Sequence, residues 1–369
     1  MKTAFTILLV VHALIHALGF IKAFGLAQLP QLTLPISRPL GVLWLGAGMA
    51  MLGAAVALHA WPRGFWIVGA LAVVASQAVI VCAWRDARFG TAANALVLLG
   101  VVEAFLAIGP LSLRAELDRE VTRGLARATP QDMVTEQDLA PLPSPVQRYL
   151  RYVGVVGHPR VQSLRVRFTG RIRSGPTAAW MPLVAEQYSF TDRPTRLFFM
   201  EARMSGLPVE ALHSYVGEQA SMRVKVLSLV RMVDARGPAF TSAETVTLFN
   251  DLCVMAPAAL IDRAIRWEPV DETLVRASFT AAGHTVAATL RFDDEGRLVD
   301  FFSDDRPSLD SNGTTFTRQR WSTPLSGYRA FGPYRLASRG EARYGDAQGG
   351  YAYGEFAMES IEYNVASRS

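Results

Sequence analysis

The sequence predicts a protein in two parts, a four-span helical transmembrane domain followed by a mainly-β soluble domain. Four apolar stretches crowd into the first third of the 369 residues, and each is long enough to cross a bilayer, which needs about 20 residues. From about residue 160, apolar and polar residues alternate with the period of two that is typical of strands. One long apolar helix interrupts this pattern. We therefore expect a curved antiparallel sheet or open barrel with an internal helix.

The expected spans cover residues 4–24, 40–60, 64–84 and 92–111, which makes residues 1–112 a four-helix transmembrane domain. The apolar run of the first span is too long for a signal peptide, and no small-residue cleavage site ends it before Lys22 and Pro30. Gly46, Ala50 and Ala54 form a row of small residues that permits close helix approach. Tryptophans near the span ends suit the membrane interface: Trp44, Trp61, Trp66 and Trp84.

The distribution of charge argues against nucleic-acid binding and predicts an orientation. The net positive charge of +5 falls largely on the first third, not on a folded basic patch. An even number of spans places both termini on one side. That side carries six basic residues against four on the other: Lys2, Arg63, Arg114, Arg119, Arg123 and Arg127 against Lys22, Arg38, Arg85 and Arg88. The positive-inside rule then predicts a cytoplasmic soluble domain.

Polar residues inside the spans are candidates for function. His12 and His16 share one helix face, and Asn94 and Glu103 lie in the fourth span. Two histidines and a carboxylate could hold a metal ion or relay protons, which would make the protein a membrane redox or metal-binding protein using His12, His16 and Glu103. The alternative is that these side chains hydrogen-bond each other or a backbone carbonyl, and this alternative is favoured. We therefore predict no metal and no cofactor.

A juxtamembrane helix and a proline-rich linker join the two parts over residues 113–145. An apolar stripe with pairs of opposite charge predicts a helix over 113–128, which Thr129 and Pro130 end. The stretch 130–145 is polar and rich in proline, so the soluble domain is placed at 146–369. A short helix over 144–153 opens it, with Ser144 as N-cap and Pro145 at the first position.

The pattern of the soluble domain predicts roughly ten strands, mostly antiparallel and joined by short turns. Apolar residues alternate in several runs, and Asp293–Gly296 forms a hairpin turn between two of them. The runs that predict strands are 164–172, 198–204, 222–226, 286–292, 298–302, 328–339 and 351–363.

The segment TLFNDLCVMAPAALID, residues 247–262, belongs to the helix that interrupts these strands. Thr241 followed by Glu244 predicts a capping box at its start, and Pro257 ends it. Its polar residues Glu244, Thr247, Asn250 and Asp251 gather on a narrow stripe. A helix that is apolar over most of its girth is buried, and the simplest place for it is inside the curved sheet.

Four segments together resemble a family of bacterial membrane proteins known only as a domain of unknown function: VHALIHALGFIKAFGLAQLPQLTLPISRPLG, WRDARFGTAANALVLL, PLPSPVQRYLRYVGVVG and the PAAL of LFNDLCVMAPAALID. The resemblance covers nearly the whole chain and implies a multi-span protein of the bacterial cytoplasmic (inner) membrane. It supplies no established activity and no catalytic residues. By architecture alone, the soluble half is similar to the lipoprotein-carrier fold, in which an unclosed barrel holds acyl chains.

The chain offers no convincing catalytic group, so enzymatic activity stays open with a non-enzymatic role favoured. Cys253 lies deep in an apolar helix without an activating base, and a buried structural thiol is favoured over a nucleophile. The alternating arginines Arg165, Arg167, Arg171 and Arg173 could meet lipid headgroups. A solvent face of a strand is the favoured interpretation of this arginine ladder.

The favoured function is binding or carrying a hydrophobic ligand such as a lipid on the apolar face of the sheet. The expected partners are membrane lipids and a hydrophobic small molecule; the sequence does not address the oligomeric state. The alternatives are the membrane redox or metal-binding protein and an envelope assembly or interaction protein without a ligand. The residues expected to contact the ligand are Phe168, Phe198, Met200, Phe249, Leu252 and Met255.

Overall fold

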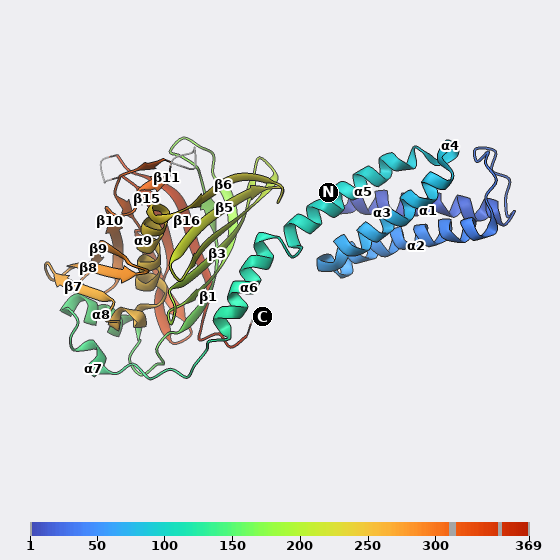
Figure 1. The fold of residues 1–369 in the computed structure, drawn as a ribbon. Helices are drawn as coiled ribbons and strands as arrows, with labels where there is room; N and C mark the ends of the chain where they lie inside the picture. The colour runs from blue at the N-terminus through green and yellow to red at the C-terminus, as the bar shows by residue number, and fades with distance from the viewer. Residues whose placement is uncertain (1, 310–314, 346–348, 368–369) are drawn as a thin grey trace. The chain divides into compact units, whose positions relative to one another are not determined.

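The computed structural model describes residues 2–309, 315–345 and 349–367. It separates into two compact units, Met1–Glu116 and Leu117–Ser369, which are treated one at a time below. The first is helical and the second is built mainly of strands (Figure 1). The sequence predicted both classes of structure correctly.

The first unit contains the four apolar helices α1 (Lys2–Ala23), α2 (Arg38–Ala60), α3 (Phe65–Cys82) and α5 (Gly90–Ile108), with a short turn η1 (Pro62–Gly64) and a short helix α4 (Trp84–Ala87) between them. Four segments within this unit and the adjoining residues have the length and composition to cross a membrane. Helix α1 packs against α2 and α5, and α3 packs against the same two helices.

The close approach of α1 and α2 depends on Gly19 and Gly48, and not on the predicted Gly46. A Cβ on Gly48 would lie 2.9 Å from the carbonyl oxygen of Ala13, and one on Gly19 would lie 2.3 Å from the Trp44 ring. Gly46 has no neighbour within 4 Å of such a Cβ, whereas Ala54 of the same predicted row is fully buried in the core of the bundle and Ala50 packs against that core. The contact face is set by the glycine that lies opposite a backbone carbonyl.

The second unit begins with three helices that lie outside the main sheet. They are α6 (Leu113–Leu125), which starts in the first unit, α7 (Glu136–Leu139) and α8 (Ser144–Val153). Gly124 of α6 allows the ring of Phe190 to approach, since a Cβ there would lie 2.3 Å from it. In α8, Pro145 lies in the first turn, and Gly154 ends the helix in the left-handed conformation with φ +88°.

One antiparallel sheet of fourteen strands dominates the second unit within the described residues. The strand order is β6-β5-β4-β3-β2-β1-β16-β15-β13-β10-β9-β8-β7, with β14 added on β15. The two-residue strands β11 (Ser308–Leu309) and β12 (Phe316–Thr317) pair separately. The strands of the main sheet are β1 (Ser163–Ile172), β2 (Met181–Phe190), β3 (Thr195–Met204), β4 (Leu207–Val216), β5 (Gln219–Val226), β6 (Val230–Arg236), β7 (Ile265–Pro269), β8 (Leu274–Ala281), β9 (His284–Phe292), β10 (Leu298–Ser303), β13 (Trp321–Ser322), β14 (Leu325–Phe331), β15 (Tyr334–Tyr344) and β16 (Tyr351–Tyr363).

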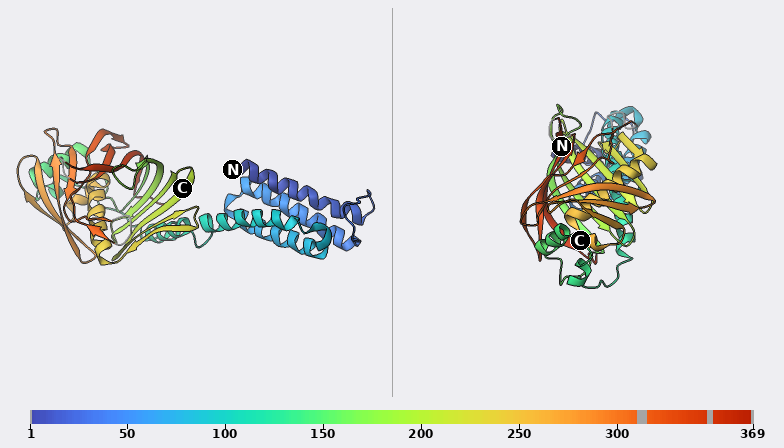
Figure 2. Two further views of the ribbon diagram at one scale, coloured as in Figure 1. Left: turned by 90° about the horizontal axis from the view of Figure 1, so that it is seen from above. Right: turned by 90° about the vertical axis from the view of Figure 1, so that its left-hand side faces the viewer.

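The sheet curls around helix α9 (Pro238–Met255), which confirms the expected open barrel with an internal helix (Figure 2). Helix α9 contacts β5 and β6 at one end of the strand order and β9 and β10 toward the other end. It thus lies inside the curled sheet, between one end of the strand order and strands near the other end. The turn η2 (Pro257–Ile261) follows, as Pro257 predicted.

Side chains fill the space between α9 and strands β8 and β10, and this side of the curled sheet is called the filled half below. Phe249 of α9 is fully buried and stacks on Phe279 of β8 with a centroid distance of 5.1 Å. Phe301 of β10 meets the same ring edge-on at 5.5 Å. Cys253 is fully buried beside them, and burial raises the pKa of its thiol well above the usual value. This is the inert, structural environment expected from the sequence.

Two details of the sequence interpretation are wrong. Helix α9 begins at Pro238 with Gly237 as N-cap, three residues before the predicted capping box, and Thr241 instead bonds the carbonyl of Gly237 and the amide of Ala220. Residues 328–339 are a hairpin and not one strand. Gly332, at φ +59°, turns the chain between β14 and β15, because glycine tolerates this conformation.

The arginine ladder of β1 is only partly a solvent face. Arg165 is 4% exposed and donates to Glu186 of β2 over 2.6 Å. Arg171 pairs with Glu355 of β16 over 2.7 Å at the surface. The cross-strand neighbours, invisible in the sequence of β1 alone, decide which arginines are paired and buried.

Two tyrosine hydroxyls hold the C-terminal end of α9. The hydroxyl of Tyr149 in α8 donates to the carbonyl of Cys253 over 2.8 Å, and that of Tyr363 in β16 donates to the carbonyl of Met255 over 2.5 Å. Carbonyls in the last turn of a helix have no partner within the helix. Burial raises the pKa of Tyr149 well above its usual value, so the hydroxyl stays a donor.

We predict that Tyr149→Phe destabilises the β-rich unit by about 1–3 kcal/mol, because it leaves a buried carbonyl without its donor. The measurement is the guanidinium midpoint of the β-sheet circular dichroism signal of the detergent-solubilised chain. Tyr351→Phe is the matched control, since the Tyr351 hydroxyl has no hydrogen-bond partner among the described residues. Equal midpoints for the two variants would contradict the capping role.

Candidate functional site

A pocket lies on the concave face of the sheet, between α9 and the strands that this helix leaves uncovered. Its volume is about 170 Å³, and it is partly open to solvent. Strands β1, β3, β15 and β16 and the helix α9 contribute most of its lining. The pocket has a polar floor on α9 and apolar walls on the strands.

The polar floor follows from the spacing of residues on α9. Glu244, Thr247 and Asp251 are separated by three and four residues, so they share one helix face, and all three line the pocket. The opposite face carries Phe249 and Cys253, which are fully buried in the filled half. The narrow polar stripe of the sequence is therefore the face that α9 turns toward the open half.

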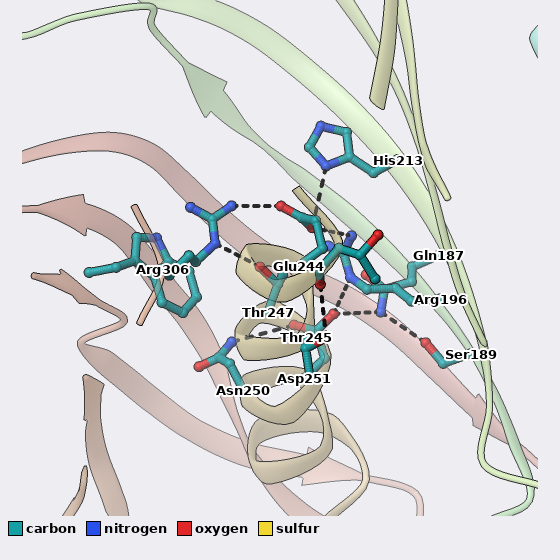
Figure 3. Close-up of polar contacts among 12 residues, drawn as sticks. Gln187, Ser189, Arg196, His213, Glu244, Thr245, Thr247, Asn250, Asp251 and Arg306 are labelled. Atoms are coloured by element: carbon teal, nitrogen blue, oxygen red, sulfur yellow. Dashed lines mark hydrogen bonds and ion pairs between the residues drawn. The ribbon is translucent and has the colours of Figure 1, made fainter. Parts of the chain in front are cut away.

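A buried ion pair anchors the floor. Arg306, 8% exposed, donates from Nη2 to Oε1 of Glu244 over 3.0 Å and from Nε to the hydroxyl of Thr247 over 2.7 Å (Figure 3). Its Nη1 donates to the hydroxyl of Tyr344, and its guanidinium lies 4.7 Å from the ring centre of Trp321. This is the set of partners that a buried charge requires.

A second ion pair lies about two turns further along α9, at Asp251. Oδ2 of Asp251 accepts from Nε of Arg196 over 2.5 Å and from the side-chain amide of Gln187 over 2.8 Å (Figure 3). Asn250 donates to the other oxygen of Asp251 over 3.4 Å and accepts from Thr323 over 2.5 Å. Strands β2 and β3 thereby fix the rotation of α9 about its own axis.

Charges in the floor are balanced. Burial raises the pKa of Glu244, but its interactions with Arg306, His213 and Arg196 outweigh the effect of burial, so the pKa lies well below its usual value. Glu244 is therefore ionised at neutral pH. The two arginines and the two carboxylates cancel each other, so the floor is strongly polar but has little net charge.

The apolar walls extend beyond the pocket as a continuous strip. Phe168, Phe198 and Phe356 surround one side with ring centres 6.2–6.3 Å apart. The cluster to which they belong runs on along the same face to the turn between β5 and β6, through Met200, Ala202, Met204, Val209, Val224, Val226 and Leu227. Nearby apolar side chains are exposed at the strand turns: Leu207, Leu229, Val230 and Met232.

The residues expected to contact a ligand divide into two groups. Phe168, Phe198, Met200 and Met255 line the pocket. Phe249 and Leu252 do not, because they belong to the faces of α9 that pack into the filled half. Sequence periodicity showed that α9 is apolar over most of its surface but not which apolar face meets the open half.

Sequence reasoning missed several residues of the site. Arg196 lies on the same face of β3 as Phe198 and Met200, and this charge on an apolar face was a usable signal. Arg306 follows β10 in an irregular segment, where no local pattern marks it. His213 and Gln187 also needed the strand pairing to be recognised.

In the first unit, the buried polar residues of the apolar helices form a hydrogen-bonded network without Glu103. Nε2 of His12 lies 3.1 Å from the hydroxyl of Ser76 and 2.9 Å from Oδ1 of Asn94, whose amide donates to Gln77 over 3.0 Å. His16 Nδ1 donates to the carbonyl of His12 over 2.9 Å.

Glu103 is exposed on the bundle surface and contacts neither histidine, because it lies nine residues beyond Asn94 on α5, about 13 Å along the helix. The structure therefore does not assemble the proposed group of His12, His16 and Glu103. Within residues 2–309, 315–345 and 349–367, no three His, Cys, Asp or Glu side chains are placed to hold a metal ion.

We predict that Arg306→Met destabilises the β-rich unit by about 3–5 kcal/mol, because it removes the hydrogen-bonded partner of the buried Glu244 carboxylate. The double variant Arg306→Met with Glu244→Gln should regain most of this loss, since it removes both charges. The measurement is the guanidinium midpoint of the β-sheet circular dichroism signal. A double variant no more stable than Arg306→Met alone would contradict an ion pair at this place.

Two of the solved structures to which the chain is similar share low sequence identity with it. An outer membrane lipoprotein-sorting protein domain from Vibrio parahaemolyticus shares 8% identity over 56% of this chain and 87% of its own, with a TM-score of 0.34. A DUF1329 family protein from Desulfovibrio piger shares 13% identity over 56% of this chain and 88% of its own, with a TM-score of 0.28. At these scores neither structure bears on the function.

No curated protein matches the chain at a significant level. A family model does match it, over residues 132–356, which is more than half of the chain and includes most of the curled sheet, α9 and all the charged residues of the floor. The chain belongs to the family of unknown function DUF6544, as the resemblance of its sequence indicated.

Proposed function

We propose that the β-rich unit binds a hydrophobic or amphipathic ligand such as a lipid, and that the four apolar helices hold this unit at a membrane. The observation that carries the proposal is the pocket between α9 and the uncovered strands. Its apolar walls offer burial to a hydrocarbon group, and its floor offers a few fixed polar groups. Such a combination is typical of small-molecule sites.

The size of the pocket limits what it can enclose. An apolar cavity of about 150 Å³ takes up a molecule of the size of benzene. The pocket of about 170 Å³ therefore accommodates a ring or a short length of chain. A longer ligand would extend along the apolar strip toward Leu227 and the exposed side chains of the strand turns.

Membrane attachment supports a lipid as the ligand class. The β-rich unit follows the fourth apolar helix directly in the chain, so membrane lipids are the hydrophobic molecules at the highest local concentration. The cytoplasmic membrane of a bacterium, with the β-rich unit on the cytoplasmic side, is our proposal for the location. It follows from the resemblance and from the count of positive charges.

We predict that Met200→Trp abolishes lipid binding, because the larger ring fills the pocket between Phe198 and the floor. Lipids that remain bound to the full-length chain after detergent exchange are identified by native mass spectrometry. Val184→Trp is the matched control, since Val184 lies on β2 but is half exposed and does not line the pocket. A wild type free of bound lipid, or equal lipid in the two variants, would contradict the proposal.

We predict that green fluorescent protein fused after residue 130 is fluorescent and that alkaline phosphatase fused there is inactive, because six positive charges on that side outnumber four on the other. Fusions after Pro35, in the first loop, should give the opposite pair of results. Active alkaline phosphatase after residue 130 would place the β-rich unit on the outer side.

A further inference from the structure

We propose that the pocket selects an uncharged lipid whose head carries a hydroxyl group, with this hydroxyl between Glu244, Arg196 and His213. The proposal rests on the function proposed above and concerns only the chemistry of the ligand head. Free fatty acids are then not the preferred ligand, although their hydrocarbon chains would fit the same apolar walls of the pocket.

The geometry of one oxygen atom carries the inference. Oε2 of Glu244 lies 3.9 Å from Nη1 of Arg196 and 3.8 Å from Nδ1 of His213. Both distances are too long for hydrogen bonds, although all three side chains line the pocket. The other carboxylate oxygen is already bonded to Arg306. Oε2 of Glu244 therefore lies within ion-pair distance of Arg196 and His213, the contacts drawn as dashed lines in Figure 3, but close enough for a direct hydrogen bond to neither.

A hydroxyl group is the chemical group that suits the gap between these atoms. An oxygen inserted between two atoms 3.9 Å apart can lie about 2.8 Å from each, which is the usual hydrogen-bond distance. The hydroxyl donates its proton to Oε2 of Glu244 and accepts from Arg196 or His213. An ester can only accept, so it leaves the carboxylate without a donor.

The charge of the floor explains the exclusion of fatty acids. Arg196 and Arg306 are already paired with Asp251 and Glu244, over 2.5 Å and 3.0 Å. A ligand carboxylate in the gap would lie against the ionised carboxylate of Glu244, while Arg196 and Arg306 are already paired and Arg339, which also lines the pocket, is exposed to solvent. Like charges this close repel each other strongly in a partly dehydrated site.

The rest of the ligand has a defined path. Arg196, Phe198, Met200, Ala202 and Met204 share one face of β3, and the last four belong to the apolar strip. Arg196 and Met204 are eight residue steps apart along the strand, which is about 27 Å at 3.4 Å per residue. The head at Arg196 and the tail toward Met204 therefore match a long-chain amphiphile lying along β3.

The test compares three ligands with the same chain: 1-oleoylglycerol, methyl oleate and oleate. The full-length chain in detergent is mixed with equal amounts of all three, and native mass spectrometry reads the bound fraction, with Met200→Trp as the nonspecific background. We expect at least tenfold more 1-oleoylglycerol than oleate, and several-fold more than methyl oleate. Oleate bound as well as 1-oleoylglycerol overturns the inference. Absence of all three above background overturns the proposed pocket itself.

Two variants test the role of the gap. His213→Gln leaves both ion pairs intact and should reduce the advantage of 1-oleoylglycerol over methyl oleate at least threefold, whereas His284→Gln, outside the pocket, should not change it. Glu244→Gln should raise oleate to within threefold of 1-oleoylglycerol; its fold is checked by circular dichroism. If His213→Gln keeps the wild-type preference, the hydroxyl site is wrong, whether or not Glu244→Gln folds.

Discussion

The two-faced helix α9 is the constraint on which the β-rich unit depends. Its apolar face buries Phe249 and Cys253 against one half of the curled sheet, and its polar stripe can then point only toward the other half. Burying a carboxylate on that stripe is costly unless it is paired. The pairing of Glu244 with Arg306, which follows β10, and of Asp251 with Arg196 of β3 meets this requirement from opposite sides of the sheet.

This arrangement explains why the barrel is filled on one side and open on the other. Helix α9 lies inside the curled sheet and contacts β5 and β6 at one end of the strand order and β9 and β10 toward the other, so it covers part of the concave face. Its C-terminal end is fixed by the hydroxyls of Tyr149 and Tyr363. The strands that it leaves uncovered keep an apolar face, and the pocket forms where that face meets the charged stripe.

A fixed polar floor beneath apolar walls favours selection by the ligand head. The side chains of the floor already satisfy most of each other's hydrogen bonds, so little reorganisation is required on binding. Membership of DUF6544 supplies no activity for comparison, and the family model includes Arg196, Glu244, Asp251 and Arg306 within its limits. The chemistry of these four residues is therefore the most direct guide to the function.

The sequence by itself determined the two-part organisation, the four apolar helices, the antiparallel strands and the burial of α9, because these follow from local periodicity. It also contained the polar stripe of Glu244, Thr247 and Asp251. Only the tertiary structure decided what the stripe faces. Arg196, His213 and Arg306 reach it from segments 31–62 residues away, and Glu103 stays away from His12 and His16. Contacts of this kind depend on strand order and helix rotation, which no local pattern encodes.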